Sequence, residues 1–234
     1  MQEIIRIDLN GVNCYLGKQD NNFILFDTGG HIILDKEFDN RYETLLKQLE
    51  AHGCTPENLK LIVLTHGDND HVANASALKK HFGAKIAMNE SDRALVENPD
   101  IDMVMSSFKY RGVIFPLVML FMKKQIRKIM VKTLDDYERF APDIFLSDSD
   151  SLDEYGFDAQ ILHVPGHTPG SIAILAANGE LIAGDALANN KKPENAPNAY
   201  DFDLLKSSID KIKAAGAKII LPGHGNPFDL SLVK

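Results

Sequence analysis

Four side chains able to bind a metal ion lie close together between His66 and His71. They come directly after an apolar run at residues 61–64 and before a segment with helical character. The side chains of residues i and i+2 of an extended loop point to the same side, so His66 and Asp68 can bind one ion. Asp70 and His71, at the turn into the helix, can face a second ion. The alternative is a polar loop with an aspartate that caps the helix.

Three further apolar segments end in the same manner. A histidine, His167, follows 161–164 through a Gly/Pro turn, Asp185 follows 181–183, and His224 follows 219–221. Ligands at the carboxyl ends of several strands converge on one edge of a sheet, which is where α/β folds place their sites. All the side chains together form a mixed nitrogen and oxygen cluster, large enough for two metal ions that share a bridging carboxylate and a bridging water.

The elements that must position these side chains follow an alternating pattern. Short segments rich in Ile, Leu and Val predict buried strands at 23–26, 61–64, 161–164, 172–175, 181–183 and 219–221. Amphipathic segments predict helices at 39–52, 73–82 and 202–214, followed by Gly53, Gly83 and Gly216, which suit left-handed caps. Strands that alternate with helices predict an α/β or α+β fold with the helices outside the sheets.

Composition narrows the class of protein. The chain has 234 residues, is 44% hydrophobic and 25% charged, and carries a net charge of −8, which predicts one larger domain over 1–234 with no general affinity for nucleic acid. The two cysteines, Cys14 and Cys54, form no disulfide framework and no secretory signal is visible, so a cytoplasmic location is expected. The longest apolar run, 113–122, is half the roughly 20 residues of a membrane-spanning helix.

Five motifs in order along the chain resemble those of the metallo-β-lactamase-fold hydrolase superfamily. They are Asp27-Thr28-Gly29, the loop 66–71, Gly166-His167-Thr168, Gly184-Asp185 and Gly223-His224. The resemblance covers nearly the whole chain. It implies an α+β fold, an αββα sandwich of two packed mixed β-sheets with helices on the outer faces and metals in a cleft along one edge.

The resemblance also implies a ligand set. His66, Asp68 and His167 would bind the first ion, Asp70, His71 and His224 the second, and Asp185 would bridge two divalent ions, with zinc expected first. Asp68 departs from the family pattern, which usually has histidine there. A carboxylate at this position makes iron or manganese more competitive with zinc and leaves the bridging water less acidified.

The implied activity is hydrolysis of an ester, thioester or lactone of a small molecule by a metal-bridging hydroxide, with Asp70 orienting the water or accepting its proton. The alternatives are a phosphodiesterase acting on an anionic substrate and a di-iron oxidoreductase. A lactonase resemblance fits the length and the central insertion. A glyoxalase II role is disfavoured because in that enzyme a helical extension follows the last motif, whereas nine residues follow Gly225 here. A true β-lactamase is doubtful because no export signal is visible.

The segment from about 91 to 151 breaks the alternating pattern and is interpreted as a helical insertion, with a helix starting near Pro116. Residues 103–134 hold seven basic side chains and no acidic one, which leaves 18 basic and 33 acidic residues, a net charge of −15, in the rest of the chain. Three interpretations stay open. The insertion is a helical pair with a solvated basic face, a lid that forms an apolar pocket over the cleft for an acyl chain, or a peripheral membrane contact or homodimer interface through 105–132.

Several other polar residues receive a structural interpretation. Asp27 is expected as a turn residue, with a hydrogen bond to a metal-binding histidine as the alternative. Thr168 and Ser171 either contact substrate or stabilise their turn. The histidines without ligand-like context, expected as packed or surface side chains, are His31, His52, His81 and His163.

Overall fold

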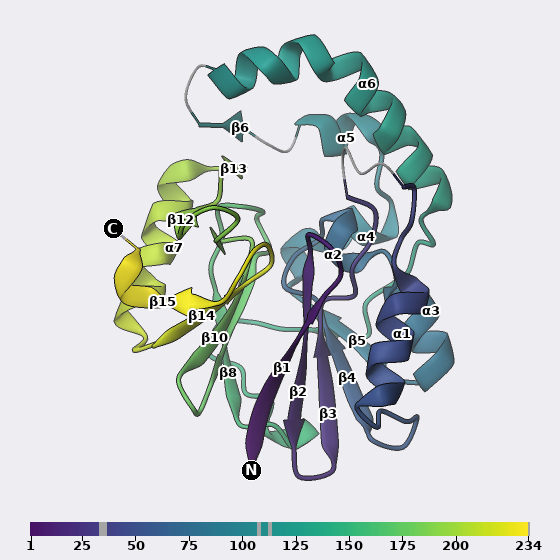
Figure 1. Ribbon diagram of the computed structural model, residues 1–234, viewed down its shortest axis with the longest axis vertical. Coiled ribbons are helices and arrows are strands. Elements are labelled where there is room, and N and C mark those ends of the chain that lie inside the picture. Colours follow the sequence, from purple (N-terminus) through teal and green to yellow (C-terminus); the bar gives the residue numbers. More distant parts are fainter. Residues whose placement is uncertain (33–36, 107–108, 112–113, 234) are drawn as a thin grey trace.

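Two β-sheets pack face to face with helices on both outer sides (Figure 1). A computed structural model describes residues 1–32, 37–106, 109–111 and 114–233. The first sheet has the order β1-β2-β3-β4-β5-β7 and the second the order β15-β14-β10-β9-β8. The four layers confirm the predicted α+β sandwich.

The first sheet consists of β1 (Gln2–Asp8), β2 (Asn13–Gln19), β3 (Asn22–Phe26), β4 (Leu59–Val63), β5 (Lys85–Met88) and β7 (Ile144–Phe145). The second consists of β8 (Ala159–His163), β9 (Ile172–Ala176), β10 (Glu180–Gly184), β14 (Ile219–Pro222) and β15 (Phe228–Asp229). Two short pairs join β11 (Leu187–Ala188) to β12 (Glu194–Asn195) and β13 (Asn198–Ala199) to β6 (Lys109–Tyr110).

Three apolar cores hold the layers together. The central core lies between the sheets and includes Phe26, Ile174 and Leu221. A second core packs α1 (Tyr42–Ala51) and α3 (Ala75–Phe82) on the first sheet, and a third packs α7 (Phe202–Ala214) on the second. Helix α7 begins where the Asp201 side chain accepts hydrogen bonds from two backbone N–H groups of its first turn. The three predicted helices and six predicted strands therefore exist within a few residues of their expected bounds.

Strand direction places the carboxyl ends of the site-bearing strands at one edge of the sandwich. In the first sheet β3, β4 and β5 run parallel to one another. In the second sheet β10 runs parallel to β14, and β9 is antiparallel to both β8 and β10, so β8, β10 and β14 share one direction. The loops that follow these strands all reach the same edge, as the sequence predicts.

The insertion crosses that edge. It contains α4 (Arg93–Glu97), α5 (Ile101–Ser106) and the long helix α6 (Ile114–Asp136), which arches over the end of the sandwich in Figure 1. Helix α6 begins two residues before Pro116. Within the predicted range of about 91–151, the short strand β7 follows α6 and pairs with β5 in the first sheet. Residue 113 of the apolar run and the side chains of 114–116, 118 and 119 lie outside the described residues.

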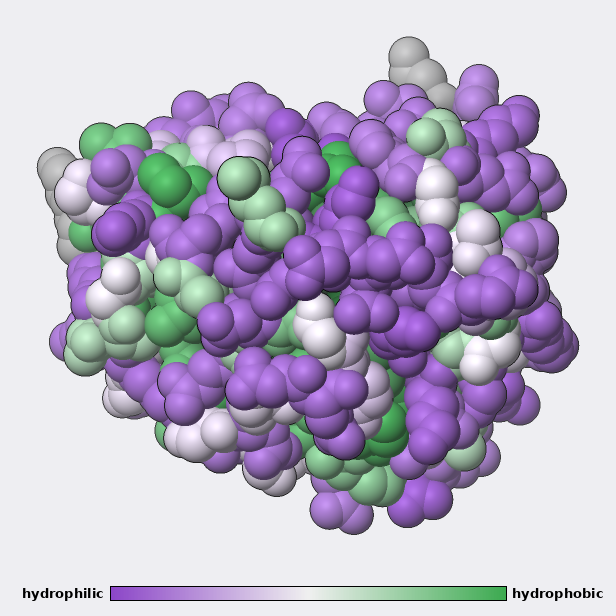
Figure 2. Space-filling view, turned by 90° about the horizontal axis from the view of Figure 1, so that it is seen from below, coloured by the Kyte–Doolittle hydropathy of each residue, from purple (hydrophilic) through white to green (hydrophobic). Residues whose placement is uncertain are grey.

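The opposite end of the molecule, which carries the amino ends of β3 and β4, is seen in Figure 2. Hydrophilic side chains cover most of this face, and the apolar ones form small separate groups. None of the helices within the described residues is long and apolar enough to cross a membrane.

Candidate metal centre

The seven side chains selected from the sequence lie together at the strand-end edge. Two groups have their ligand atoms within 4.8 Å of one another, and these groups are His66, Asp68 and His167, and Asp70, His71 and His224. His66 and Asp68 lie in the loop that follows β4, and Asp70 and His71 lie in the short helix α2 (Asn69–Val72). His167 follows β8, and His224 follows β14. Residues far apart in the sequence thus meet as the motif order predicts.

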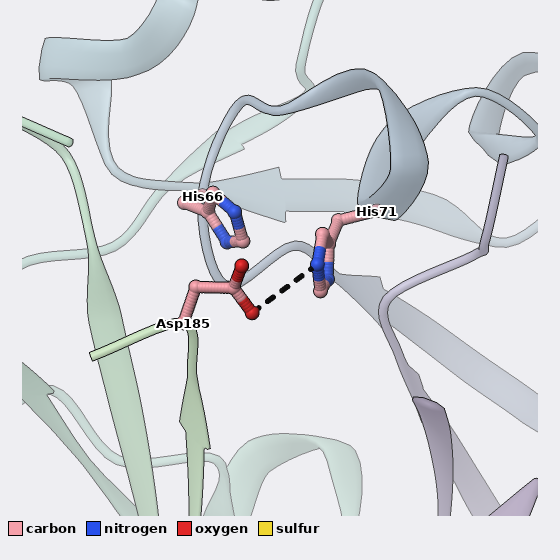
Figure 3. Close-up of side chains that lie close together, drawn as sticks. All are labelled: His66, His71 and Asp185. Carbon is pink, nitrogen blue, oxygen red and sulfur yellow. Dashed lines mark ion pairs between the residues drawn. The ribbon is translucent and has the colours of Figure 1, made fainter. Parts of the chain in front are cut away.

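Asp185 lies between the two groups. Its carboxylate is 3.4 Å from Nε2 of His71, 3.2 Å from Nε2 of His224 and 3.8 Å from Nε2 of His167. It also forms a third group with His66 and His71, drawn in Figure 3, where the imidazoles of the loop and of α2 face the carboxylate that follows β10. A carboxylate in this position can bind two cations at once.

All four imidazoles are held through Nδ1 and turn Nε2 toward the cluster. Nδ1 of His167 is 3.1 Å from the carbonyl oxygen of Asn198, and Nδ1 of His224 is 2.5 Å from that of Gly11. A carbonyl only accepts, so both rings carry the proton on Nδ1 and leave Nε2 available as a ligand atom.

Asp27 orients the other two imidazoles. Its Oδ2 lies 2.9 Å from Nδ1 of His71 and accepts a 2.9 Å hydrogen bond from Oγ1 of Thr65. The Thr65 hydroxyl, having donated its proton to Asp27, must accept from Nδ1 of His66 at 2.9 Å. One buried carboxylate therefore sets the tautomer of a histidine in each group. The expectation that Asp27 is mainly a turn residue is wrong: its φ of 61° does place it in a turn, but its carboxylate reaches the cluster.

Two observations show that the cluster fits cations. Nε2 of His66 and Oδ1 of Asp185 are buried and have no hydrogen-bond partner among the described residues, which is costly for polar atoms unless a ligand satisfies them. A Cβ at Gly223 would lie 2.2 Å from Oδ1 of Asp185 and 2.7 Å from Cε1 of His71. Glycine at position 223 thus leaves space for the side chains of Asp185 and His71, and a larger residue at this position would fill that space.

The charges within the cluster are strongly coupled. Burial opposes ionisation of Asp68, but its hydrogen bond with His167 and the electrostatic attraction of the His66 and His167 imidazoles outweigh it and hold its pKa below the usual range. Burial likewise opposes protonation of His167, but its hydrogen bond to Asp68 raises its pKa to about 9. Despite burial, the charge of Asp185 raises the pKa of both His71 and His224 well above the usual value. Cation binding must displace these protons, so affinity increases with pH.

Asp92, at the start of the insertion, connects the two loops of the first group. Its carboxylate accepts hydrogen bonds from the backbone N–H of Gly67 at 2.9 Å and of Gly170 at 2.7 Å, and from the Thr168 hydroxyl at 2.6 Å. Burial raises its pKa, although the Thr168 hydrogen bond opposes this. Asp92 was not among the residues predicted from the sequence, because nothing near it in the sequence marks its partners.

Ser171 Oγ accepts a hydrogen bond from the backbone N–H of Thr168 and lies 2.8 Å from its hydroxyl, and both residues are buried. This supports the interpretation that both residues stabilise their turn. His163 bonds the carbonyl oxygen of Pro169 within the same turn. His31 is more than a packed side chain, since it lines the cavity beside the cluster and pairs with Asp136 of α6 at 2.7 Å.

A cavity of about 360 Å³ opens onto the cluster beneath the insertion. Asp68, Asp70, Asp185 and His224 form part of its wall, and α6 contributes several apolar side chains opposite them. The volume lies within the range of about 300–1,000 Å³ usual for small-molecule sites. The insertion is therefore in the position of a lid.

Comparisons with known proteins agree with this geometry. The model of the metallo-beta-lactamase superfamily matches residues 7–224. The hydroxyacylglutathione hydrolase GloC of Haemophilus influenzae is 29% identical over 96% of this chain and 90% of its own, and the probable metallo-hydrolase YflN of Bacillus subtilis is 26% identical over 73% of this chain and 66% of its own.

Solved structures show the same fold. The B3 metallo-beta-lactamase BLEG-1 superposes with a TM-score of 0.70 at 21% identity, covering 99% of this chain and 95% of its own. TTHA1623, crystallised in a di-iron-bound form, gives a TM-score of 0.64 at 22% identity, covering 98% of this chain and 96% of its own.

Proposed function

The chain belongs to the metallo-beta-lactamase superfamily and is a metal-dependent hydrolase, and we propose that it holds two divalent ions and cleaves an ester, thioester or lactone bond. The observation that carries the proposal is the convergence of four Nε2 atoms and three carboxylates, with buried atoms of His66 and Asp185 left without hydrogen bonds. The first ion would be held by His66, Asp68 and His167 and the second by Asp70, His71 and His224, with Asp185 between them.

Zinc is the expected metal, and Asp68 favours a contribution from iron or manganese. Each group contains two imidazoles and one carboxylate, a set that suits all three metals. TTHA1623, which shares the fold, was crystallised with two irons, and this supports testing for iron as well as zinc.

Bound divalent ions supply polarisation of the substrate carbonyl and acidification of water. The chain supplies the remaining steps. Asp70, whose Oδ2 is 3.3 Å from Nε2 of His224 and which lines the cavity, orients the attacking water and accepts its proton. The lid excludes bulk water from the reacting bond.

Thioester cleavage, one of the three proposed reactions, gains support from GloC, which is named as a hydroxyacylglutathione hydrolase. Because 90% of the length of GloC is matched, the helical extension expected of glyoxalase II does not separate this chain from that relative. The phosphodiesterase alternative loses support, since it relied on the basic residues of the insertion to hold an anion at the metals, and none of the described ones lines the cavity.

The test is metal content by mass spectrometry together with hydrolysis of an ester, thioester and lactone panel, for the natural protein and His71→Ala. The natural protein should hold close to two ions and lose activity on chelation. His71→Ala should lose the second ion, and its activity should fall further than the roughly 10–100-fold seen when an outer-shell partner is changed. His81→Ala, at an exposed histidine, is the control. A His71→Ala protein with full metal load and full turnover would refute the proposal.

A further inference from the structure

The cavity has a polar floor and an apolar roof. The floor is the cluster of carboxylates and imidazoles, and the roof comes from the insertion. Its apolar members are Leu95 of α4, Val104 of α5 and Ile126, Met130 and Leu134 of α6. The three α6 residues follow the i, i+4, i+8 spacing of one helix face, so the helix turns a continuous apolar stripe toward the reacting groups.

The basic charge of the insertion does not reach this cavity. No lysine or arginine is found among the described residues that line it. On α6 the basic side chains lie on the outer surface, where Arg127 pairs with Asp102 and Lys132 lies 3.5 Å above the ring of Phe38. An anionic group bound under the roof would therefore lack a cationic side chain to offset its desolvation.

The roof is fixed at its carboxyl end. Asp136 at the end of α6 pairs with His31, and the Tyr137 hydroxyl donates to the carbonyl oxygen of Val96 at 3.2 Å. Ile126 and Met130 are 3% and 8% exposed, so their side chains are already held in place over the cavity. A preformed apolar surface binds an apolar chain with little ordering cost.

We propose that this cavity binds the uncharged apolar acyl chain of a carboxylic ester or lactone, so that the protein prefers such substrates to glutathione thioesters. The assignment rests on the hydrolase function proposed above. Water supplies the hydroxyl that bonds to the acyl carbon and the proton that leaves with the alcohol as the acyl carbon–oxygen bond breaks. Met130 is the residue that sets chain length, because it lies in the middle of the apolar stripe.

The experiment compares the natural protein with Met130→Trp on p-nitrophenyl esters from acetate to decanoate and on S-lactoylglutathione. In the natural protein each methylene that is buried should raise kcat/KM by about fourfold until the cavity is full. Met130→Trp should abolish this chain-length dependence, so that kcat/KM for the decanoate ester no longer exceeds kcat/KM for the acetate ester. Val131→Trp is the matched control, because Val131 is the next residue of the helix and is 41% exposed.

A second readout does not need turnover. Binding of methyl octyl ketone, a ketone that cannot be hydrolysed, is followed by calorimetry on the metal-containing protein. It should occur in the natural protein and in Val131→Trp and be lost in Met130→Trp. A kcat/KM for S-lactoylglutathione above that of every ester, or chain-length dependence retained in Met130→Trp, would overturn the proposal. A protein that binds the ketone and cleaves nothing would support the cavity assignment and refute the hydrolase function.

Discussion

The two ligand groups of the metal centre have the same kinds of side chains but are held in place by different elements. The first half is His66, Asp68 and His167, and the second half is Asp70, His71 and His224. Each half has two imidazoles and one carboxylate, with Asp185 between the halves. The second half is oriented by the sandwich itself, through Asp27 after β3 and the carbonyl of Gly11. The first half depends in addition on Asp92 of the insertion. Equal ligand sets can therefore differ in affinity because of the elements that position them.

Among the substitutions that distinguish the two halves, Asp27→Asn is expected to have the largest effect. The amide keeps the shape but loses the carboxylate that fixes the tautomers of His71 directly and His66 through Thr65, so affinity should fall about 10–100-fold, more for the second ion. Competition titration with a chelator measures both constants. Asp20→Asn, at an exposed aspartate, is the control. Equal losses at both ions would remove the distinction drawn between the halves.

Asp92→Asn should act on the first half alone. An amide has one acceptor oxygen, so it loses one of the two backbone hydrogen bonds, and affinity for the first ion should fall by about tenfold while the second is unchanged. The same titration measures this, with Asp102→Asn in the same insertion as control. Weaker binding at the second ion instead would show that the insertion supports both halves.

Asp68→His should produce the smallest loss, because it exchanges one ligand for another. The substitution gives the first half three imidazoles, so the two halves no longer have the same ligands. The bound metal should shift toward zinc, and activity should be retained within about tenfold. Metal content of protein purified without added metal measures the shift. Unchanged metal content would mean that Asp68 does not determine which metal is bound.

The cluster could be predicted from the sequence because each ligand directly follows a buried apolar segment. His167 and His224 come after Gly/Pro turns that also mark the strand ends, so residue type, strand and position are all local signals. The same signals predicted the central strands of both sheets. The strands β1 and β2 were missed, since charged and polar residues interrupt their apolar positions.

The residues that position the ligands or line the cavity beside them could not be predicted from such local signals. Asp92 accepts hydrogen bonds from residues 25 and 78 positions away, so only the folded chain shows its role. Asp27 lies in a turn-forming sequence that explains the residue equally well without the cluster. His31 reaches the cavity because α6 passes over it, and the position of the insertion depends on tertiary packing.

The position of Asp185 between the two ligand groups has a consequence for the stability of the whole molecule. Its strand belongs to one sheet, and His71 follows a strand of the other. Ions held between them would cross-link the two sheets at an edge where the apolar core ends. Separation of the sheets would then release the ions, so metal concentration would enter the free energy of unfolding and couple both halves of the sandwich into one cooperative transition.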